Sequence, residues 1–339
     1  MNSNQLNQIV QEEGLIPLGV VPLFYSDSYS QFLRWLEQGK HAGLKYLEKY
    51  QDIRKEPSRL LEGAKAAIIV ALPYSQGDSW PPKPYERSRA AQYARFTDYH
   101  NFLRQSGLRI VEKLKMNPEL ASQSFRVLVD TAPVLERALA VQTQSSFIGK
   151  NTCLIHPSHG SFLLLAEILT THPFKFDLPE KKEECGSCTL CQVHCPTGAL
   201  NEDYVLDSNR CLAYWTIEHR GTIPEEFWPW LSKYYFGCDI CQLVCPYNEQ
   251  AKTYQLPEKI VPKQMPSLFE VATMSQAKYE NLFGGTPMTR AKRNGLRRNA
   301  LIAMCVTQDP RLEEALMTVQ DDGGFPLEET VEQIRKKLF

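Results

Sequence analysis

Residues 185–196 read CGSCTLCQVHCP and residues 238–246 read CDICQLVCP, and these two stretches decide the fold of the middle of the chain. Together with Cys211, which lies between them, they hold eight of the ten cysteines in the 339-residue sequence. Cysteines at such short, regular spacings are metal ligands or disulfide partners, and the spacing itself helps to distinguish the two.

The first stretch has the spacing C-x2-C-x2-C-x3-C-P, which is typical of bacterial ferredoxins that hold two iron–sulfur clusters. In those proteins three closely spaced thiolates bind one cluster, and the fourth binds the other. The same crossover predicts one [4Fe-4S] cluster on Cys185, Cys188, Cys191 and Cys245. It predicts a second [4Fe-4S] cluster on Cys195, Cys211, Cys238 and Cys241. Because Cys211 lies far upstream of its partners, we expect residues 212–237, with Tyr214, Trp215, Trp228 and Trp230, to loop out and cover a cofactor or substrate.

Zinc and disulfides are the alternatives for these cysteines. Two zinc sites would also use eight thiolates, but zinc ribbons repeat C-x2-C pairs and do not need the longer run. Disulfides require an oxidising compartment, and the N-terminus does not resemble a secretory signal. A radical-SAM enzyme would carry a C-x3-C-x2-C triplet, which this sequence lacks. The spacing therefore favours iron–sulfur clusters.

The composition is that of a globular protein. Apolar residues make up 43% of the chain and the formal net charge is −1, so any nucleic-acid partner must bind a local basic patch. The most apolar run, Phe162–Leu169, is shorter than a membrane span and contains Glu167. We expect no membrane insertion and a cytoplasmic location.

The N-terminal half alternates between helical and strand patterns. Helical periodicity is found within residues 1–50 and again from 101 to 114, and compact apolar runs at 15–24, 66–72 and 125–129 predict strands. Asp130 ends the last of these strands, and Pro133 suits the start of the next helix. Asp130 is either a reacting group at a strand end or a residue that orders the turn.

Residues 152–170 predict a hairpin, with Pro157 to Gly160 as its turn. The preceding Gly149–Lys150–Asn151–Thr152 is not a phosphate-binding P-loop, because Gln144 and Asn151 replace required residues. This turn is either structural or ligand-binding.

The C-terminal part is basic and helical. A run of five cations without an acidic residue consists of Arg290, Lys292, Arg293, Arg297 and Arg298. Helices at 312–318 and 327–338 follow, so this end of the chain predicts a stack of short helical pairs. The basic stripe is either a solvated helix face or a contact for a phosphate backbone.

Four features together resemble the epoxyqueuosine reductases, cobalamin-dependent iron–sulfur enzymes of tRNA queuosine biosynthesis. They are VDTAPVLER at 129–137, FIGKNT at 147–152, YARFTDYH at 93–100 and the cysteine pattern with its separate Cys211. The resemblance extends from about Tyr46 to Tyr247. The combination is specific, although each feature outside the cysteines is weak alone.

The resemblance implies an α+β fold with three parts. Residues 1–175 would form an α/β cobalamin-binding catalytic domain with a nitroreductase-like sheet, and residues 176–250 a ferredoxin-like two-cluster domain. Residues 251–339 would form a linker and a short HEAT-like helical module that contacts tRNA. The implied activity is reduction of epoxyqueuosine to queuosine at the wobble position, with cobalamin fed by the two clusters from an external low-potential donor. We expect a monomer.

The resemblance also assigns roles to individual residues. Asp130 would be the proton donor, which requires burial to raise the pKa of its carboxyl group. Expected cobalamin contacts are Tyr93, Asp130, Gly149, Lys150, Asn151 and Thr152. His100, His156 and His159 are candidate axial ligands or structural residues, and the basic C-terminal residues and the 85–99 loop are expected to bind tRNA. A cobalamin-dependent reductive dehalogenase and a non-enzymatic electron carrier are the competing functions.

Overall fold

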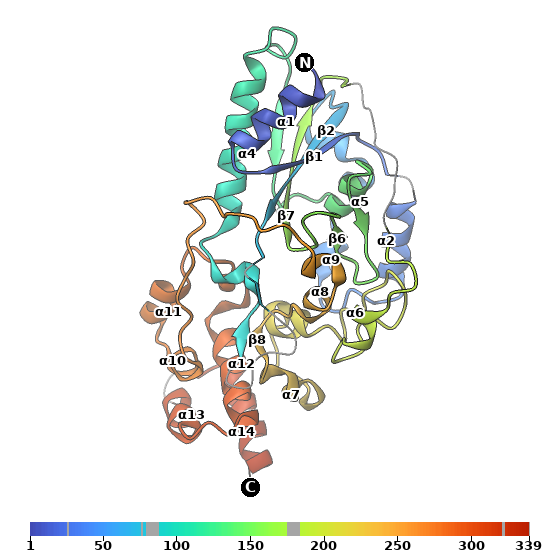
Figure 1. The fold of residues 1–339 in the computed structure, drawn as a ribbon. Coiled ribbons are helices and arrows are strands. Elements are labelled where there is room, and N and C mark those ends of the chain that lie inside the picture. The colour runs from blue at the N-terminus through green and yellow to red at the C-terminus, as the bar shows by residue number, and fades with distance from the viewer. Residues whose placement is uncertain (26, 76, 79–87, 175–183, 321–322, 339) are drawn as a thin grey trace.

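A four-stranded antiparallel sheet forms the N-terminal half of the molecule (Figure 1). The computed structural model describes residues 1–25, 27–75, 77–78, 88–174, 184–320 and 323–338. The strand order is β1-β2-β7-β4. The strands are β1 (Ile16–Pro22), β2 (Ala66–Pro73), β4 (Phe125–Leu128) and β7 (Leu163–Thr170). The three strands expected from the sequence at 15–24, 66–72 and 125–129 are confirmed.

Strand β2 lies inside the sheet and is buried along its whole length. Its Ile68 and Val70 face a core shared with α1 (Ser3–Glu12) and α4 (Tyr99–Lys115), whereas Ala67 and Ile69 face a core shared with α5 (Glu136–Val141). Successive residues of β2 therefore face opposite sides of the sheet, as expected for a strand that is covered on both sides. Other N-terminal elements are α2 (Ser28–Glu37), η1 (Lys45–Leu47), α3 (Gln51–Lys55) and η2 (Pro57–Leu60).

Helix α4 packs closely on the edge strand β4. A Cβ atom at Gly107 of α4 would lie 2.6 Å from Val127 Cγ1, so only glycine allows this approach. The helix begins at Asp98, whose side chain accepts a hydrogen bond from the backbone N–H of His100. The cap and the close packing fix the start of α4 beside the end of β4, where Asp130 follows.

The predicted hairpin at 152–170 is wrong in its pairing. The turn exists, because His156 and Gly160 form an isolated bridge, but the segment before it does not pair with β7. Instead β6 (Leu154–Ile155) pairs with β5 (Phe147–Ile148), and β7 inserts between β2 and β4. The strongly apolar second half of β7 is buried there, which a two-stranded hairpin could not achieve.

The two cysteine stretches have matching backbone structures. Short helices α6 (Leu190–Val193) and α8 (Ile240–Leu243) contact each other, and α9 (Pro246–Glu249) follows α8. Val193 N donates to Thr189 O over 3.0 Å, and Leu243 N donates to Asp239 O over 2.8 Å. The equivalent hydrogen bonds show that each stretch forms the same helical turn around its cysteines.

Residues 212–236 do not form a loose flap. They form the π-helical turn η4 (Tyr214–Glu218), η5 (Glu225–Phe227), α7 (Trp228–Leu231) and β8 (Tyr234–Phe236), and β8 pairs with β3 (Arg89–Ala90). Trp228 is fully buried in the core that this segment shares with the C-terminal helices. The expectation that Trp228 covers a cofactor or nucleotide is therefore wrong, because the tryptophan is used for packing.

The C-terminal helices gather at the end of the molecule opposite the N-terminus (Figure 1). They are α10 (Leu268–Thr273), α11 (Gln276–Phe283), η6 (Pro287–Ala291), α12 (Lys292–Val306), α13 (Leu312–Gln320) and α14 (Leu327–Leu338). Helix α12 is the centre of this group and contacts α7, α10, α13 and α14. In the part of the chain that the structure describes, no helix combines the length and the apolar character needed to cross a bilayer.

Candidate functional site

The first group of cysteines comes together around Cys191 in α6. Burial, followed by the neighbouring Cys185, Cys245 and Cys188, raises the pKa of the Cys191 thiol to about 11. These are the four cysteines that the ferredoxin crossover predicts for one cluster. Cys245 comes from the second stretch and lies near the other three, as the predicted crossover would require.

The second group lies around Cys238. Burial raises the pKa of its thiol, and Cys211 and Cys195 add to the effect. The pKa of the Cys241 thiol is raised first by its contact with Cys153, then by burial, and also by Cys238 and Cys211. Cys195, Cys211, Cys238 and Cys241 are therefore neighbours, and Cys153 lies beside them although it belongs to neither spacing pattern.

Backbone N–H groups point at the cysteine sulfurs. Ala199 N donates to Cys195 Sγ over 3.2 Å, and Lys150 N donates to Cys185 Sγ over 3.4 Å. Nearby backbone N–H groups also act to lower the pKa values of the Cys211, Cys238 and Cys245 thiols, against the larger effect of burial, which raises them. Donors of this kind stabilise thiolates and set the reduction potential of a cluster that the thiolates hold.

The Gly149–Thr152 turn is placed against the cysteine region. Besides the Lys150 amide, Asn151 Nδ2 donates to Cys241 O over 3.2 Å, and Lys150 Nζ pairs with Asp203 Oδ2 over 3.1 Å. The carbonyl of Thr152 accepts a hydrogen bond from Arg137, which follows Glu136 in α5. This turn therefore connects both cysteine groups to the helix that follows Asp130.

Asp130 lies where β4 ends, in a left-handed backbone conformation with φ +48°. Its Oδ2 accepts a hydrogen bond from the Tyr99 hydroxyl over 3.1 Å and lies 3.2 Å from His100 Nε2. On its other side the His100 ring contacts Asp98, with Nδ1 2.6 Å from Oδ1. The side chain of Asp130 remains 57% exposed, so one side of the carboxylate is open.

The charge state of Asp130 differs from the sequence expectation. The hydrogen bond with His100 lowers the pKa of the Asp130 carboxyl, outweighing burial, which acts in the opposite direction. The hydrogen bond with Asp130, followed by that with Asp98, raises the pKa of His100 to about 9. At neutral pH the proton is held on the histidine ring, and Asp130 is a carboxylate. Because both ring nitrogens contact carboxylates, neither points freely at another ligand.

Residues distant in sequence surround Asp130. The guanidinium of Arg290 helps to lower the Asp130 pKa, lies over the Tyr46 ring at 5.4 Å, and pairs with Glu218 over 2.8 Å. Glu136 has a buried carboxyl oxygen without a hydrogen-bond partner among the described residues, and burial raises its pKa to about 8. The sequence showed no signal for Tyr46 or Glu218, which only the fold brings here.

Two of the five predicted tRNA contacts are inaccessible. Arg297 and Arg298 are fully buried in α12. Arg297 Nε donates to Ala272 O over 2.9 Å, and Arg298 donates to the carbonyls of His219, Gly221 and Trp215. Their role as tRNA contacts is wrong, because their guanidinium groups satisfy buried backbone carbonyls. Arg290 and Lys292 are exposed, whereas Arg293 is half-buried.

Tyr93, Arg89, Arg95 and His156 are half-buried, and each already contacts another protein group. Tyr93, in η3 (Gln92–Arg95), packs edge-on against Tyr99 at 6.4 Å between ring centroids. Arg89 and Arg95 of the 85–99 loop both pair with Asp78, and residues 79–87 lie outside the described residues. His156 accepts a hydrogen bond from Ser158 N, and burial lowers its pKa to about 4.

Two protein-family models match this chain, one over the cysteine stretches and one over the segment that ends just after Asp130. The model of a 4Fe-4S double cluster binding domain matches residues 184–248, and the model described as epoxyqueuosine reductase QueG, DUF1730, matches residues 54–131. An epoxyqueuosine reductase of Pseudomonas aeruginosa is 31% identical over 97% of this chain and 91% of its own length. This chain belongs to the epoxyqueuosine reductase family.

Solved epoxyqueuosine reductases have the same fold. The Bacillus subtilis enzyme, described with its catalytic aspartate loop swung out of the active site, aligns with a TM-score of 0.86 at 26% identity. The alignment covers 98% of this chain and 88% of that one. An epoxyqueuosine reductase solved with an epoxyqueuosine-modified tRNA stem loop aligns with a TM-score of 0.83 at 27% identity, covering 97% and 88%. As a family member, this chain is an oxidoreductase with a double [4Fe-4S] cluster domain.

Proposed function

We propose that this epoxyqueuosine reductase converts epoxyqueuosine in tRNA to queuosine. The observation that carries the proposal is the partly exposed carboxylate of Asp130, held by Tyr99 and His100 after β4, with the Gly149–Thr152 turn linking the following helix α5 to both cysteine groups. Such a site combines an electron supply with a proton donor. Reducing an epoxide to an alkene and water consumes two electrons and two protons, so both are needed.

The clusters are assigned as the spacing suggests. Cys185, Cys188, Cys191 and Cys245 would hold one, and Cys195, Cys211, Cys238 and Cys241 the other. Support comes from the grouping of the thiols and the N–H donors that point at their sulfurs. An external low-potential protein would supply the electrons, one at a time.

Cobalamin is the proposed reactive cofactor, and the surroundings of Asp130 fit a large group with polar edges. Arg54 Nε and Glu136 Oε1 are buried polar atoms without hydrogen-bond partners in the described structure, and the Tyr46 ring is 46% exposed nearby. When bound, cobalamin supplies the strongly reducing cobalt centre for the epoxide. Asp130, Tyr93 and the Gly149–Thr152 turn are the proposed contacts, with the turn also linking this region to the cysteines.

Asp130 is the proposed proton donor to the oxygen that leaves. Its exposed side can face the substrate while Tyr99 and His100 hold Oδ2. Covering that side with substrate and cofactor would remove water and favour the neutral acid, because desolvation already opposes ionisation of this carboxyl.

For tRNA, we retain Arg290, Lys292 and Arg293 as contacts and exclude Arg297 and Arg298. Arg290 is well suited, because its guanidinium lies near Asp130 and stacks on Tyr46. An anticodon loop offers unstacked bases and phosphates, which bind arginine and aromatic side chains.

The chain would be organised in three units. We retain residues 1–175 as the cobalamin-binding unit with a nitroreductase-like sheet, 176–250 as the ferredoxin-like unit and 251–339 as the HEAT-like unit. The insertion at 212–236 packs with the last unit, so these two units would move together. We propose a cytoplasmic monomer.

The deciding experiment incubates the anaerobically reconstituted, chemically reduced protein with tRNA that carries epoxyqueuosine. Nucleoside mass analysis should show epoxyqueuosine lost and queuosine gained, only with cobalamin present. Dehalogenation of organohalides without any change in the tRNA would identify a reductive dehalogenase. Electron transfer without either product would identify an electron carrier.

A further inference from the structure

His100 connects two carboxylates that come from different elements. Nδ1 lies 2.6 Å from Asp98 Oδ1, and Nε2 lies 3.2 Å from Asp130 Oδ2. The ring also stacks on Tyr99 with 4.2 Å between ring centroids and 20° between the planes. Asp98 is itself fixed, because it caps α4 through the backbone N–H of His100. The imidazole is therefore held in one orientation, with Nε2 directed at Asp130.

The charges around the ring keep a proton on it. Asp98 and Asp130 both contact it, Tyr99 and Glu136 lie nearby, and the Arg290 guanidinium lies close enough to Asp130 to lower its pKa. The hydrogen bond with Asp130 is the main cause that raises the pKa of His100 to about 9. The hydrogen bonds that Asp98 and Asp130 make with His100 are the main causes that lower the pKa values of these two carboxyl groups. At neutral pH an imidazolium thus lies between two carboxylates, and Asp130 has no proton of its own to donate.

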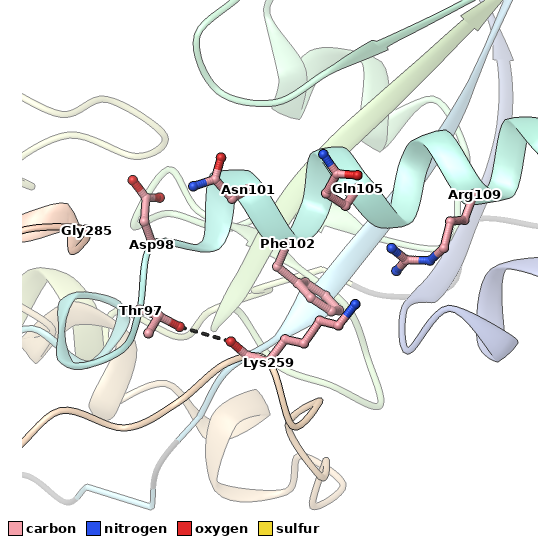
Figure 2. A pocket seen from close by; sticks show the side chains of 8 residues that line it. All are labelled: Thr97, Asp98, Asn101, Phe102, Gln105, Arg109, Lys259 and Gly285. Carbon is pink, nitrogen blue, oxygen red and sulfur yellow. Dashed lines mark hydrogen bonds between the residues drawn. The ribbon is translucent and has the colours of Figure 1, made fainter.

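Solvent reaches this arrangement at the start of α4. Figure 2 shows Asp98 lining a pocket there, together with Thr97, Asn101 and Gln105. The side chains of Asp98 and His100 are 31% and 30% exposed. Water can therefore return a proton to the pair.

We infer that His100 supplies the proton that Asp130 donates, and that Asp98 is a positioning residue for the His100 ring. The inference rests on the proposed function. The imidazolium breaks its Nε2–H bond and protonates the Asp130 carboxylate, and Asp130 then passes this proton to the departing oxygen. The neutral ring takes a second proton from water and repeats the transfer. Two protons and two electrons, the latter from the reduced cofactors, convert the epoxide to an alkene and water.

Asp98 keeps Nδ1 protonated throughout this cycle. Nε2 is therefore the nitrogen that gains and loses the proton, and it is the nitrogen that contacts Asp130. If the Asp98–His100–Asp130 contacts only held the structure together, the ring would not need to be positively charged between two carboxylates. It would also not need to exchange protons during turnover.

The first experiment measures single-turnover reduction of epoxyqueuosine tRNA by reduced holoenzyme across pH. We expect His100→Gln to lower the rate at neutral pH by about 100-fold or more, the contribution expected of a proton-transfer group. We expect the wild-type rate to decline on the alkaline side near pH 9, and Asp98→Asn to move that decline to lower pH. Added imidazole should restore turnover to His100→Ala. His172→Gln, a change at a part-exposed histidine beyond the end of β7, is the matched control.

The second measurement does not depend on activity. Nitrogen NMR of histidine-labelled, oxidised holoenzyme should show His100 titrating near pH 9, and Asp130→Asn should lower that value. Titration in the ordinary histidine range overturns the inference, as does a His100→Gln enzyme with wild-type rate and pH profile. Failure of wild-type enzyme to reduce the tRNA overturns the proposed function and the inference together, whereas an active His100→Gln enzyme overturns the inference alone.

Discussion

Tyr99 and Asp130 are joined by a hydrogen bond of 3.1 Å from the tyrosine hydroxyl to the carboxylate Oδ2. Tyr99 lies in the first turn of α4, and Asp130 follows the edge strand β4, so this contact joins the helix to the strand end that carries the proposed proton donor. The contact also helps to lower the pKa of Asp130.

Replacing each partner should have different effects. Asp130→Asn should retain iron and fold but lose about 100-fold or more in single-turnover rate, because an amide cannot donate the catalytic proton. Tyr99→Phe removes one hydrogen bond worth about 1 kcal/mol and should leave the rate within about tenfold of wild type. Iron content and thermal unfolding serve as controls for both variants. An Asp130→Asn enzyme with near wild-type turnover would exclude Asp130 as the donor.

The assignment of the cysteines to two clusters predicts which cluster is lost when one ligand is replaced. Cys245→Ser and Cys211→Ser should each reduce bound iron by roughly half, because each removes one ligand from a different four-iron cluster. Iron analysis and electron paramagnetic resonance of the reduced protein would show which cluster remains. Cys305→Ala, a change in the buried face of α12 outside both groups, should keep all the iron. The same residual spectrum in both ligand variants would contradict the assignment.

The basic C-terminal residues should separate into two classes. Arg297→Met should lower the free energy of unfolding by about 1–3 kcal/mol, because buried carbonyls such as that of Ala272 lose their donor. Unfolding by denaturant measures this effect, and the folded variant should bind tRNA as wild type does.

Lys292→Glu and Arg290→Glu should instead weaken tRNA binding while leaving cluster spectra unchanged. Each lost phosphate contact to a single-stranded loop should reduce the slope of log affinity against log salt by about 0.7. Titrations at several salt concentrations measure that slope. Unchanged affinity in both variants would assign tRNA binding to other surfaces.

The buried carboxyl groups predict how stability depends on pH. Burial raises the pKa of Glu136 from 4.5 to about 8, and raises that of Glu167 well above 4.5. Each group binds its proton more tightly in the folded state, so its contribution to stability is complete below 4.5 and is lost as the pH rises. The free energy of unfolding should fall between about pH 4.5 and 8.

Glu167→Gln should reduce this dependence. Both carboxyl oxygens of Glu167 are buried without hydrogen-bond partners among the described residues, so the charged form is strongly disfavoured and a neutral amide avoids it. The variant should unfold at a higher temperature than wild type at pH 8, with a smaller difference at pH 5. Glu314→Gln, on the exposed side of α13, is the control. A lower melting temperature of Glu167→Gln at pH 8 would contradict the prediction.

Local sequence was sufficient where one segment determines its own structure. The apolar run of β2, the strand that leads to Asp130 and the cysteine turns were all predictable, because hydrophobic period and ligand spacing are properties of short segments. The hairpin at 152–170 was not, because β7 gains more by burial between β2 and β4 than by pairing with its neighbour in sequence.

The sequence by itself determined the cysteine spacing, the strand end at Asp130 and the family. The tertiary structure alone decided which groups share an electrostatic environment. It places His100 between Asp98 and Asp130. The proton therefore lies on the His100 ring, whereas we expected it on Asp130 from the sequence. It also buries Arg297 and Arg298, which no charge pattern reveals. Protonation and exposure depend on neighbours from distant segments, and only folding brings those neighbours together.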